Sequence, residues 1–163
     1  DYMQDSAVKN FLAVKSFFKK LHNYASVLKI ELSKGKDFVM TDYNVFPDYK
    51  TRKEIINGLC GKYKFIKHCF AGKSVCGRGI DVLHIGNTKN RVLYCGGFHG
   101  SEYLTVLALL KFFEECCQAM QNDNPVGEYK IGNFLSIRGL TIVPCVNPDG
   151  TEIALHGLSL IHI

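Results

Sequence analysis

The chain has 163 residues, of which 47% are hydrophobic and 21% are charged, as in one ordinary globular domain. This composition excludes a disordered tail, a collagen-like repeat and a highly charged solvating segment. The net charge is +5, and residues 1–39 supply +3 of it through seven Lys against four acidic residues. So small a charge does not indicate nucleic-acid binding. The longest apolar stretch, 104–110, is far shorter than a membrane span, so neither nucleic acid nor membrane is expected as a partner.

Residues 1–39 have two interpretations, which the sequence leaves open. Apolar residues recur every three or four positions from Ala7 to Leu28, with lysines between them, which indicates a basic amphipathic helix. Alternatively, Met40 begins the translated protein, and 1–39 is untranslated sequence read in frame. No cleavable signal pattern is visible, which favours a cytoplasmic location.

From Met40 onward, periodicity and turn residues predict alternating helices and strands. A short helix is expected at 49–59, followed by strands at 64–70 and 80–85. The apolar strand 91–95 is expected in the centre of a sheet. It leads into a helix at 102–120 that is apolar nearly all round. A buried strand at 140–146 follows, and this order predicts an α/β domain with a sheet covered by helices.

Seven cysteines lie between Cys60 and Cys145, and no two of them have CxxC spacing. A cysteine-rich zinc finger is therefore not expected. We interpret them as reduced thiols, with Cys116 and Cys117 in the core of a buried helix rather than in a redox site.

Other residues that could carry chemistry have simpler explanations. His68, His84 and His156 have no partner at ligand spacing, and His84 is expected to be a packed or surface residue of a strand. The Gly-Lys-Ser at 72–74 lacks the glycine five positions earlier that a phosphate-binding loop requires.

The segment GGFHGSE, residues 96–102, is the first candidate functional motif. It lies where a strand ends and a helix begins, the place where open α/β sheets hold their ligands. His99 and Glu102 are three residues apart, so their side chains can converge on one point. An imidazole nitrogen and a carboxylate are suitable ligands for a first-row metal, and one further ligand would leave a position for water. Alternatively, His99 is a helix-start residue hydrogen-bonded to Glu102.

The segment IVPCVNPDG, residues 142–150, follows about forty residues later. By itself it reads as a buried strand that ends in a strong turn. The pairing of the two motifs, with GKSVCGRGI at 72–80 before them, resembles the zinc metallocarboxypeptidase family, the carboxypeptidase A-like peptidases. The resemblance covers about Tyr49 to Gly157, and its form is closer to bacterial members than to animal digestive ones.

The resemblance implies a fold and a set of roles. The expected fold is a truncated three-layer helix/mixed-sheet/helix arrangement of the carboxypeptidase-like (phosphorylase/hydrolase-like) type, with 40–157 as the N-terminal part of the domain. His99 and Glu102 match the first two ligands of one Zn²⁺ ion per complete domain. Ser101 stands where animal digestive members commonly have Arg. Residues 147–150 match a structural turn near the site.

The remaining family residues have no counterpart before residue 158. These are a third ligand His, an arginine that stabilises the oxyanion, an Asn-Arg pair that holds a substrate carboxylate, a substrate-side Tyr and a general-base Glu. The chain alone is therefore expected to be inactive, poorly soluble and a weak zinc binder.

The activity implied for a complete protein is hydrolysis of peptide bonds by a zinc-activated water, whose pKa falls to about 7. The implied partner is a peptide substrate, and in some bacterial members a peptidoglycan stem peptide cut at its D-glutamyl–diaminopimelate bond. One alternative is a deacylase of the aspartoacylase and succinylglutamate desuccinylase family, which shares the fold and a similar zinc motif. Another is a non-catalytic binding domain of the same fold.

Residues 158–163, LSLIHI, have an unusual possible origin. They can be encoded by CTG-TCT-CTT-ATA-CAC-ATC, which resembles a transposase end sequence used to prepare DNA libraries. We interpret them as a sequencing-adaptor artefact, so that His162 is not a ligand candidate. The alternative is a natural strand, because the segment alternates reasonably between apolar and polar residues.

Overall fold

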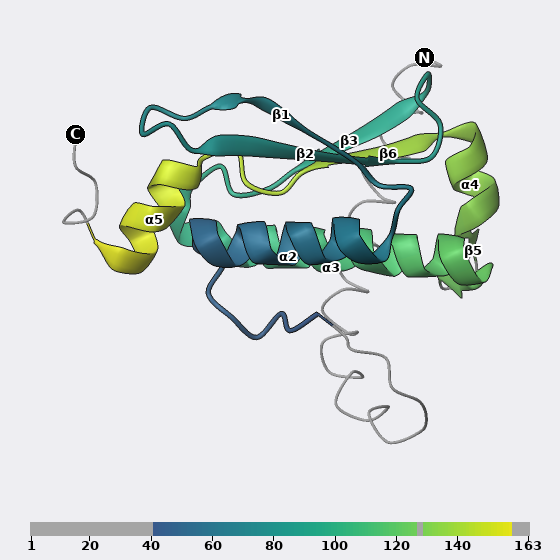
Figure 1. The fold of residues 1–163 in the computed structure, drawn as a ribbon, viewed down its shortest axis with the longest axis horizontal. Coiled ribbons are helices and arrows are strands. Elements are labelled where there is room, and N and C mark those ends of the chain that lie inside the picture. Colours follow the sequence, from purple (N-terminus) through teal and green to yellow (C-terminus); the bar gives the residue numbers. More distant parts are fainter. Residues whose placement is uncertain (1–40, 127–128, 158–163) are drawn as a thin grey trace, which may run out of the picture. The chain divides into compact units, whose positions relative to one another are not determined.

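A four-stranded mixed sheet with two long helices on one face forms the core of the structure (Figure 1). This computed structural model describes residues 41–126 and 129–157. The interpretations of residues 1–39 and 158–163 lie outside the described residues. The strands are β1 (Lys67–Lys73), β2 (Gly79–Ile85), β3 (Arg91–Cys95) and β6 (Gly139–Val143), in the order β1-β2-β6-β3.

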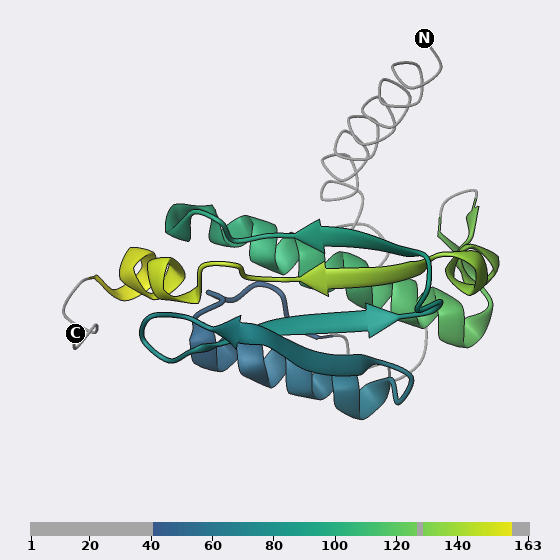
Figure 2. The same cartoon turned by 90° about the horizontal axis from the view of Figure 1, so that it is seen from above.

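The sheet combines antiparallel and parallel pairing. β2 is antiparallel to both β1 and β6, whereas β3 and β6 are parallel, with Leu93 opposite Thr141. The carboxyl ends of the two parallel strands therefore lie at the same edge of the sheet (Figure 2). The short strands β4 (Pro125–Val126) and β5 (Tyr129–Lys130) pair separately. The mixed sheet confirms the predicted α/β class.

Helix α2 (Tyr49–Lys62) begins at Asp48, whose carboxylate accepts the Thr51 backbone N–H at 2.7 Å. Such a side-chain cap satisfies a donor that the first helical turn leaves free. Helix α3 (Tyr103–Asn122) follows a 3-10 turn, η1 (Gly100–Glu102). Both helices were expected from periodicity, and they run three and two residues further than predicted.

The core lies between these helices and the sheet. It is built from aliphatic residues, aromatic residues and thiols, among them Ile56, Leu59, Leu83, Ile85, Leu110, Phe113, Cys117 and Ile142. Helix α3 is not buried all round as predicted, because Leu104 is 67% exposed. Among the described elements, α2 and α3 both lie on the same face of the sheet (Figure 1).

The predicted central position of β3 is wrong for the described residues. β3 pairs only with β6 there and forms an edge of the sheet. Leu93 is 59% exposed and Tyr94 is 41% exposed. Apolar composition favoured a doubly covered strand, but composition does not specify how many neighbours a strand has.

Two short helices were not predicted. Helix α4 (Ile131–Ile137) precedes β6, and α5 (Pro148–His156) begins within the segment that was expected to be a turn. The predicted strand at 64–70 is displaced by three residues, to Lys67–Lys73.

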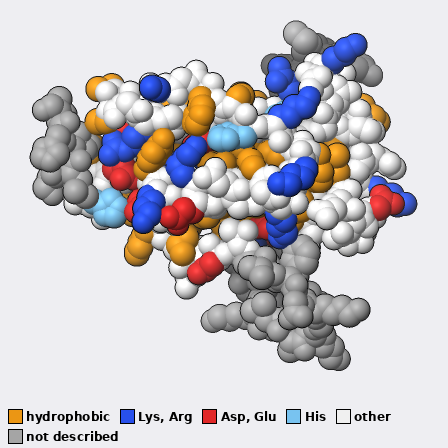
Figure 3. Space-filling model, viewed as in Figure 1, with side chains coloured by type: hydrophobic (Ala, Val, Ile, Leu, Met, Phe, Trp, Pro, Cys, Tyr) orange, Lys and Arg blue, Asp and Glu red, His pale blue; other side chains and the backbone are white. Residues whose placement is uncertain are grey.

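The surface carries no large region of one charge on the face shown in Figure 3. Lys and Arg side chains are scattered over it, with hydrophobic side chains between them. Within the described residues, no helix is both long and apolar enough to cross a membrane.

Candidate metal centre

The GGFHGSE motif forms a tight turn between β3 and α3. His99 has extended backbone and directly precedes η1, which ends at Glu102. The backbone N–H of Glu102 donates to the His99 carbonyl at 3.0 Å, which closes the turn. Both side chains are exposed. The structure thus places the two predicted ligands on one turn, at the carboxyl-end edge of the parallel strands.

The side chains of His99 and Glu102 are both available to bind a metal ion, as far as the described part of the chain shows. Neither the His99 imidazole nor the Glu102 carboxylate has a hydrogen bond or ion pair there. The alternative of a helix-start histidine bonded to Glu102 therefore has no contact to support it.

The donor chemistry of this turn fits zinc in part. An imidazole nitrogen and a carboxylate oxygen are both ordinary zinc ligands. Among residues 41–126 and 129–157, no group of three or more His, Cys, Asp or Glu side chains is arranged to hold a metal. His99 and Glu102 can therefore supply two of the three protein ligands that a catalytic zinc site uses.

The start of α5 packs directly against this turn. A Cβ atom at Gly100 would overlap the carbonyl oxygen of Gly150, so only glycine allows this approach. Asn147 caps α5 by accepting the Gly150 backbone N–H at 2.9 Å, and Pro148 occupies the first helical position. The predicted turn at 147–150 is thus a helix start that supports the candidate ligands.

Asp149 links α5 to the hairpin turn between β1 and β2. Its carboxylate accepts hydrogen bonds from Ser74 Oγ at 2.9 Å, Arg78 Nη1 at 2.8 Å and the Cys76 backbone N–H at 3.0 Å. Partial burial acts to raise the pKa of Asp149, but these hydrogen bonds outweigh it and lower the pKa. Two of the three segments that carried the family resemblance, 72–80 and 142–150, therefore meet through this carboxylate.

The other candidate residues have structural roles. His84 is buried and bonds Thr141 Oγ1 at 2.9 Å and the Gly86 carbonyl at 3.3 Å. Burial lowers the pKa of His84, which favours the neutral imidazole. His68 Nε2 lies 2.7 Å from the buried Asp81 carboxylate, which also pairs with Lys53.

The thiols of Cys116 and Cys117 are core groups, as predicted. Both are buried in α3, and burial raises the pKa of Cys116 to about 12. It raises the pKa of Cys117 as well. Protonated thiols of this kind are poor nucleophiles and poor metal ligands.

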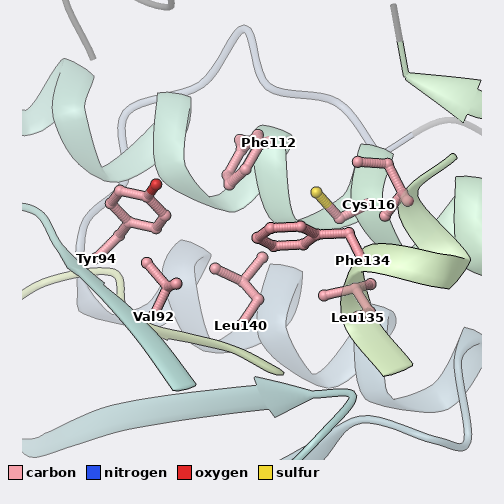
Figure 4. A pocket seen from close by; sticks show the side chains of 8 residues that line it. Val92, Tyr94, Phe112, Cys116, Phe134, Leu135 and Leu140 are labelled. Carbon is pink, nitrogen blue, oxygen red and sulfur yellow. The ribbon is translucent and has the colours of Figure 1, made fainter. Parts of the chain in front are cut away.

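Two hollows lie away from the turn formed by residues 96–102. A hollow of about 70 Å³ is lined by apolar side chains from β3, α3, α4 and β6, and Figure 4 shows Tyr94, Phe112 and Phe134 around it. A more open hollow of about 370 Å³ lies against Tyr49, Phe70 and Lys73. Neither is lined by His99 or Glu102.

Comparison with known proteins gives matches to one family of peptidases. A family model described as zinc carboxypeptidase matches residues 52–160. Gamma-D-glutamyl-L-diamino acid endopeptidase 1 of Lysinibacillus sphaericus is 29% identical over 110 residues, which cover 68% of this chain and 28% of that protein. Carboxypeptidase E of Caenorhabditis elegans is 35% identical over 92 residues, which cover 52% of this chain and 18% of that protein.

Solved structures show the same fold. The crystal structure of carboxypeptidase A from Helicoverpa armigera matches with a TM-score of 0.60 at 20% identity, covering 85% of this chain and 34% of that one. A structure of bovine thrombin-activatable fibrinolysis inhibitor matches with a TM-score of 0.58 at 18% identity, covering 70% of this chain and 35% of that one. The chain spans about a third or less of the length of each of these relatives.

Proposed function

The chain belongs to the zinc carboxypeptidase family, and from this premise we propose that the complete protein is a zinc-dependent peptidase with His99 and Glu102 as two of its zinc ligands. One observation carries the proposal. An exposed imidazole and an exposed carboxylate, the ligand types that zinc uses, share one turn at the edge of the sheet where α/β folds bind ligands. Neither has another partner among the described residues.

The chain's own residues would hold and orient the metal. The neutral imidazole of His99 and the ionised carboxylate of Glu102 are the forms that bind zinc. The chemistry that zinc supplies, when bound, is a lower pKa for its water and a polarised substrate carbonyl. Gly100 lets the backbone of the turn lie against Gly150 at the start of α5. The side chains of His99 and Glu102 are exposed and so accessible to substrate.

The third ligand and the general base are expected after residue 157. The gene downstream of codon 157 should encode a further zinc-binding His, an Asn-Arg pair and a late Glu. A complete reading frame that contains none of them would reject a catalytic role and favour a non-catalytic binding domain.

For the substrate class, we propose peptides in which D-glutamate is joined through its γ-carboxyl group to a diamino acid, as in bacterial cell-wall stem peptides. The support is the similarity to the Lysinibacillus sphaericus endopeptidase, whose name specifies that linkage. The match to the peptidase family model also favours peptide hydrolysis over the deacylase alternative.

A comparison of two histidine variants tests the site. In the complete protein, we expect His99→Ala to weaken zinc binding by more than about 100-fold, the upper end of what loss of an outer-shell partner costs. Activity should fall with it. His156→Ala is the matched control, because His156 contacts Asp48 and lies outside the turn at 96–102. Zinc content and peptide cleavage are the measurements, and full zinc occupancy in His99→Ala would reject the ligand assignment.

The substrate class needs its own assay. We expect the wild-type protein to cleave a γ-D-glutamyl-diaminopimelate peptide faster than an α-linked peptide that ends in lysine. The opposite preference would reject the cell-wall assignment and leave the peptidase proposal in place.

A further inference from the structure

We propose that Asn147 is a positioning residue that sets the backbone of the metal turn, residues 97–102, through the Phe98 carbonyl. The inference rests on the proposed function, because it concerns the turn that carries His99 and Glu102. Asn147 does not contact the metal in this proposal. It acts through the main chain of the residue that precedes His99.

The first support is a ladder of main-chain hydrogen bonds that continues past the ends of β3 and β6. Gly96 N–H donates to the Val143 carbonyl at 3.0 Å, and Val146 N–H donates to the Gly96 carbonyl at 2.9 Å. Asn147 N–H then donates to the Gly97 carbonyl at 2.9 Å. The metal turn and the start of α5 are therefore joined residue by residue, and a shift in one moves the other.

The second support is the Asn147 side chain, which uses both ends of its amide. Its Oδ1 accepts the Gly150 N–H at 2.9 Å, and its Nδ2 donates to the Phe98 carbonyl at 3.2 Å. Asp, Ser or Thr can cap a helix through an oxygen, but a carboxylate cannot donate a hydrogen bond. The position thus requires an amide for a reason that helix capping alone does not explain.

The third support is that α5 is itself held in place. Asp149 ties its first turn to Ser74, Cys76 and Arg78, while Gly150 lies against Gly100. Asn147 therefore connects an anchored helix to the peptide group before His99. Outer partners of this kind orient metal ligands, and losing one typically weakens metal affinity 10- to 100-fold.

The test compares Asn147→Asp with Asp48→Ala in the complete protein. Asn147→Asp keeps an oxygen for Gly150 and places a carboxylate oxygen opposite the Phe98 carbonyl. Asp48→Ala removes the cap of α2 and the contact of Asp48 with His156 at the end of α5, and neither Asp48 nor His156 is part of the metal turn. Zinc affinity is measured by competition with a chromophoric chelator, and the ligand field by the visible spectrum of the Co²⁺-substituted protein. The melting temperature is recorded for both variants.

We expect Asn147→Asp to weaken zinc affinity about tenfold and to change the Co²⁺ spectrum. Asp48→Ala should lower the melting temperature and leave both metal readouts at their wild-type values. If Asn147→Asp does not fold, Asn147→Ser, which keeps a capping oxygen but does not reach Phe98, should show the same tenfold loss.

Each contrary result has a distinct meaning. Wild-type zinc affinity and spectrum in a folded Asn147→Asp or Asn147→Ser protein would overturn this inference, even where stability falls. Equal changes in zinc affinity and Co²⁺ spectrum in Asp48→Ala would also overturn it, because a general loss of stability would then explain them. A wild-type protein that binds no zinc would overturn the proposed function and this inference together.

Discussion

At the scale of single residues, the Asp149 carboxylate connects two distant parts of the chain. Its side chain is only 15% exposed and accepts from Ser74, Cys76 and Arg78. Hydrogen bonds to charged groups each contribute about 1.5–3 kcal/mol. We expect Asp149→Asn, which keeps one acceptor, to lower the free energy of unfolding by about 2 kcal/mol at pH 7, as measured by urea denaturation.

The pH dependence of that difference follows from the lowered pKa of Asp149. A carboxyl whose folded-state pKa lies below its unfolded value stabilises the fold above the unfolded pKa, and this contribution is lost as pH falls through the folded pKa. The gap between wild type and Asp149→Asn should therefore narrow from pH 5 toward pH 3. Asp123→Asn is the control, because Asp123 is exposed and Asn tolerates its left-handed backbone. A gap that does not change with pH would contradict the argument.

The candidate site was predictable only where its residues are close in sequence. His99 and Glu102 were proposed as ligands because a spacing of three residues can bring two side chains together at a helix start, and the structure has both of them on one turn. The contacts of Asp149 join residues more than 70 positions apart, and no local pattern encodes such a contact. The dual use of the Asn147 amide was missed because capping and turn formation favour the same residue types.

At the scale of elements, strong apolar periodicity predicted helices reliably, whereas turn-forming residues did not distinguish a turn from the start of a helix. Helices α2 and α3 were predicted within three residues at each end. The Asn-Pro-Asp-Gly segment favoured a turn, yet Asn before a helix and Pro at its first position are also helix-start signals. Helix α4 was missed because Gly132, Ser136 and two isoleucines give it low intrinsic helix propensity.

Two glycine substitutions test how these elements are built. Gly58 lies in α2 with nothing near its missing side chain, so Gly58→Ala should stabilise the chain by about 0.5–1 kcal/mol. Gly86 follows β2 with φ of +79°, and a Cβ there would lie 2.5 Å from the Leu135 carbonyl oxygen. Gly86→Ala should destabilise it by more than about 1 kcal/mol. The free energies come from chemical denaturation, and equal effects of the two changes would refute this account.

At the scale of the whole molecule, the described sheet ends in a strand with apolar side chains and a free edge. β3 pairs with β6 on one side, and no strand pairs with its other side among the described residues. Unpaired main-chain groups beside exposed apolar side chains promote association between chains, and lysines on edge strands counter it. The chains of the two solved relatives are roughly two to two and a half times as long as this chain, so the free edge is that of this chain by itself.

We therefore expect the isolated chain to associate through β3, and Leu93→Lys to reduce that association. Leu93 is 59% exposed on the strand, whereas Val75, which is 96% exposed, lies in the hairpin turn away from it. Val75→Lys adds the same charge at a site that is not on the edge, and so serves as the control. Sedimentation velocity over a range of concentrations should show larger species for the wild type and Val75→Lys, and mainly monomer for Leu93→Lys. A monomeric wild type at every concentration, or equal rescue by Val75→Lys, would show that the free edge of β3 does not drive association.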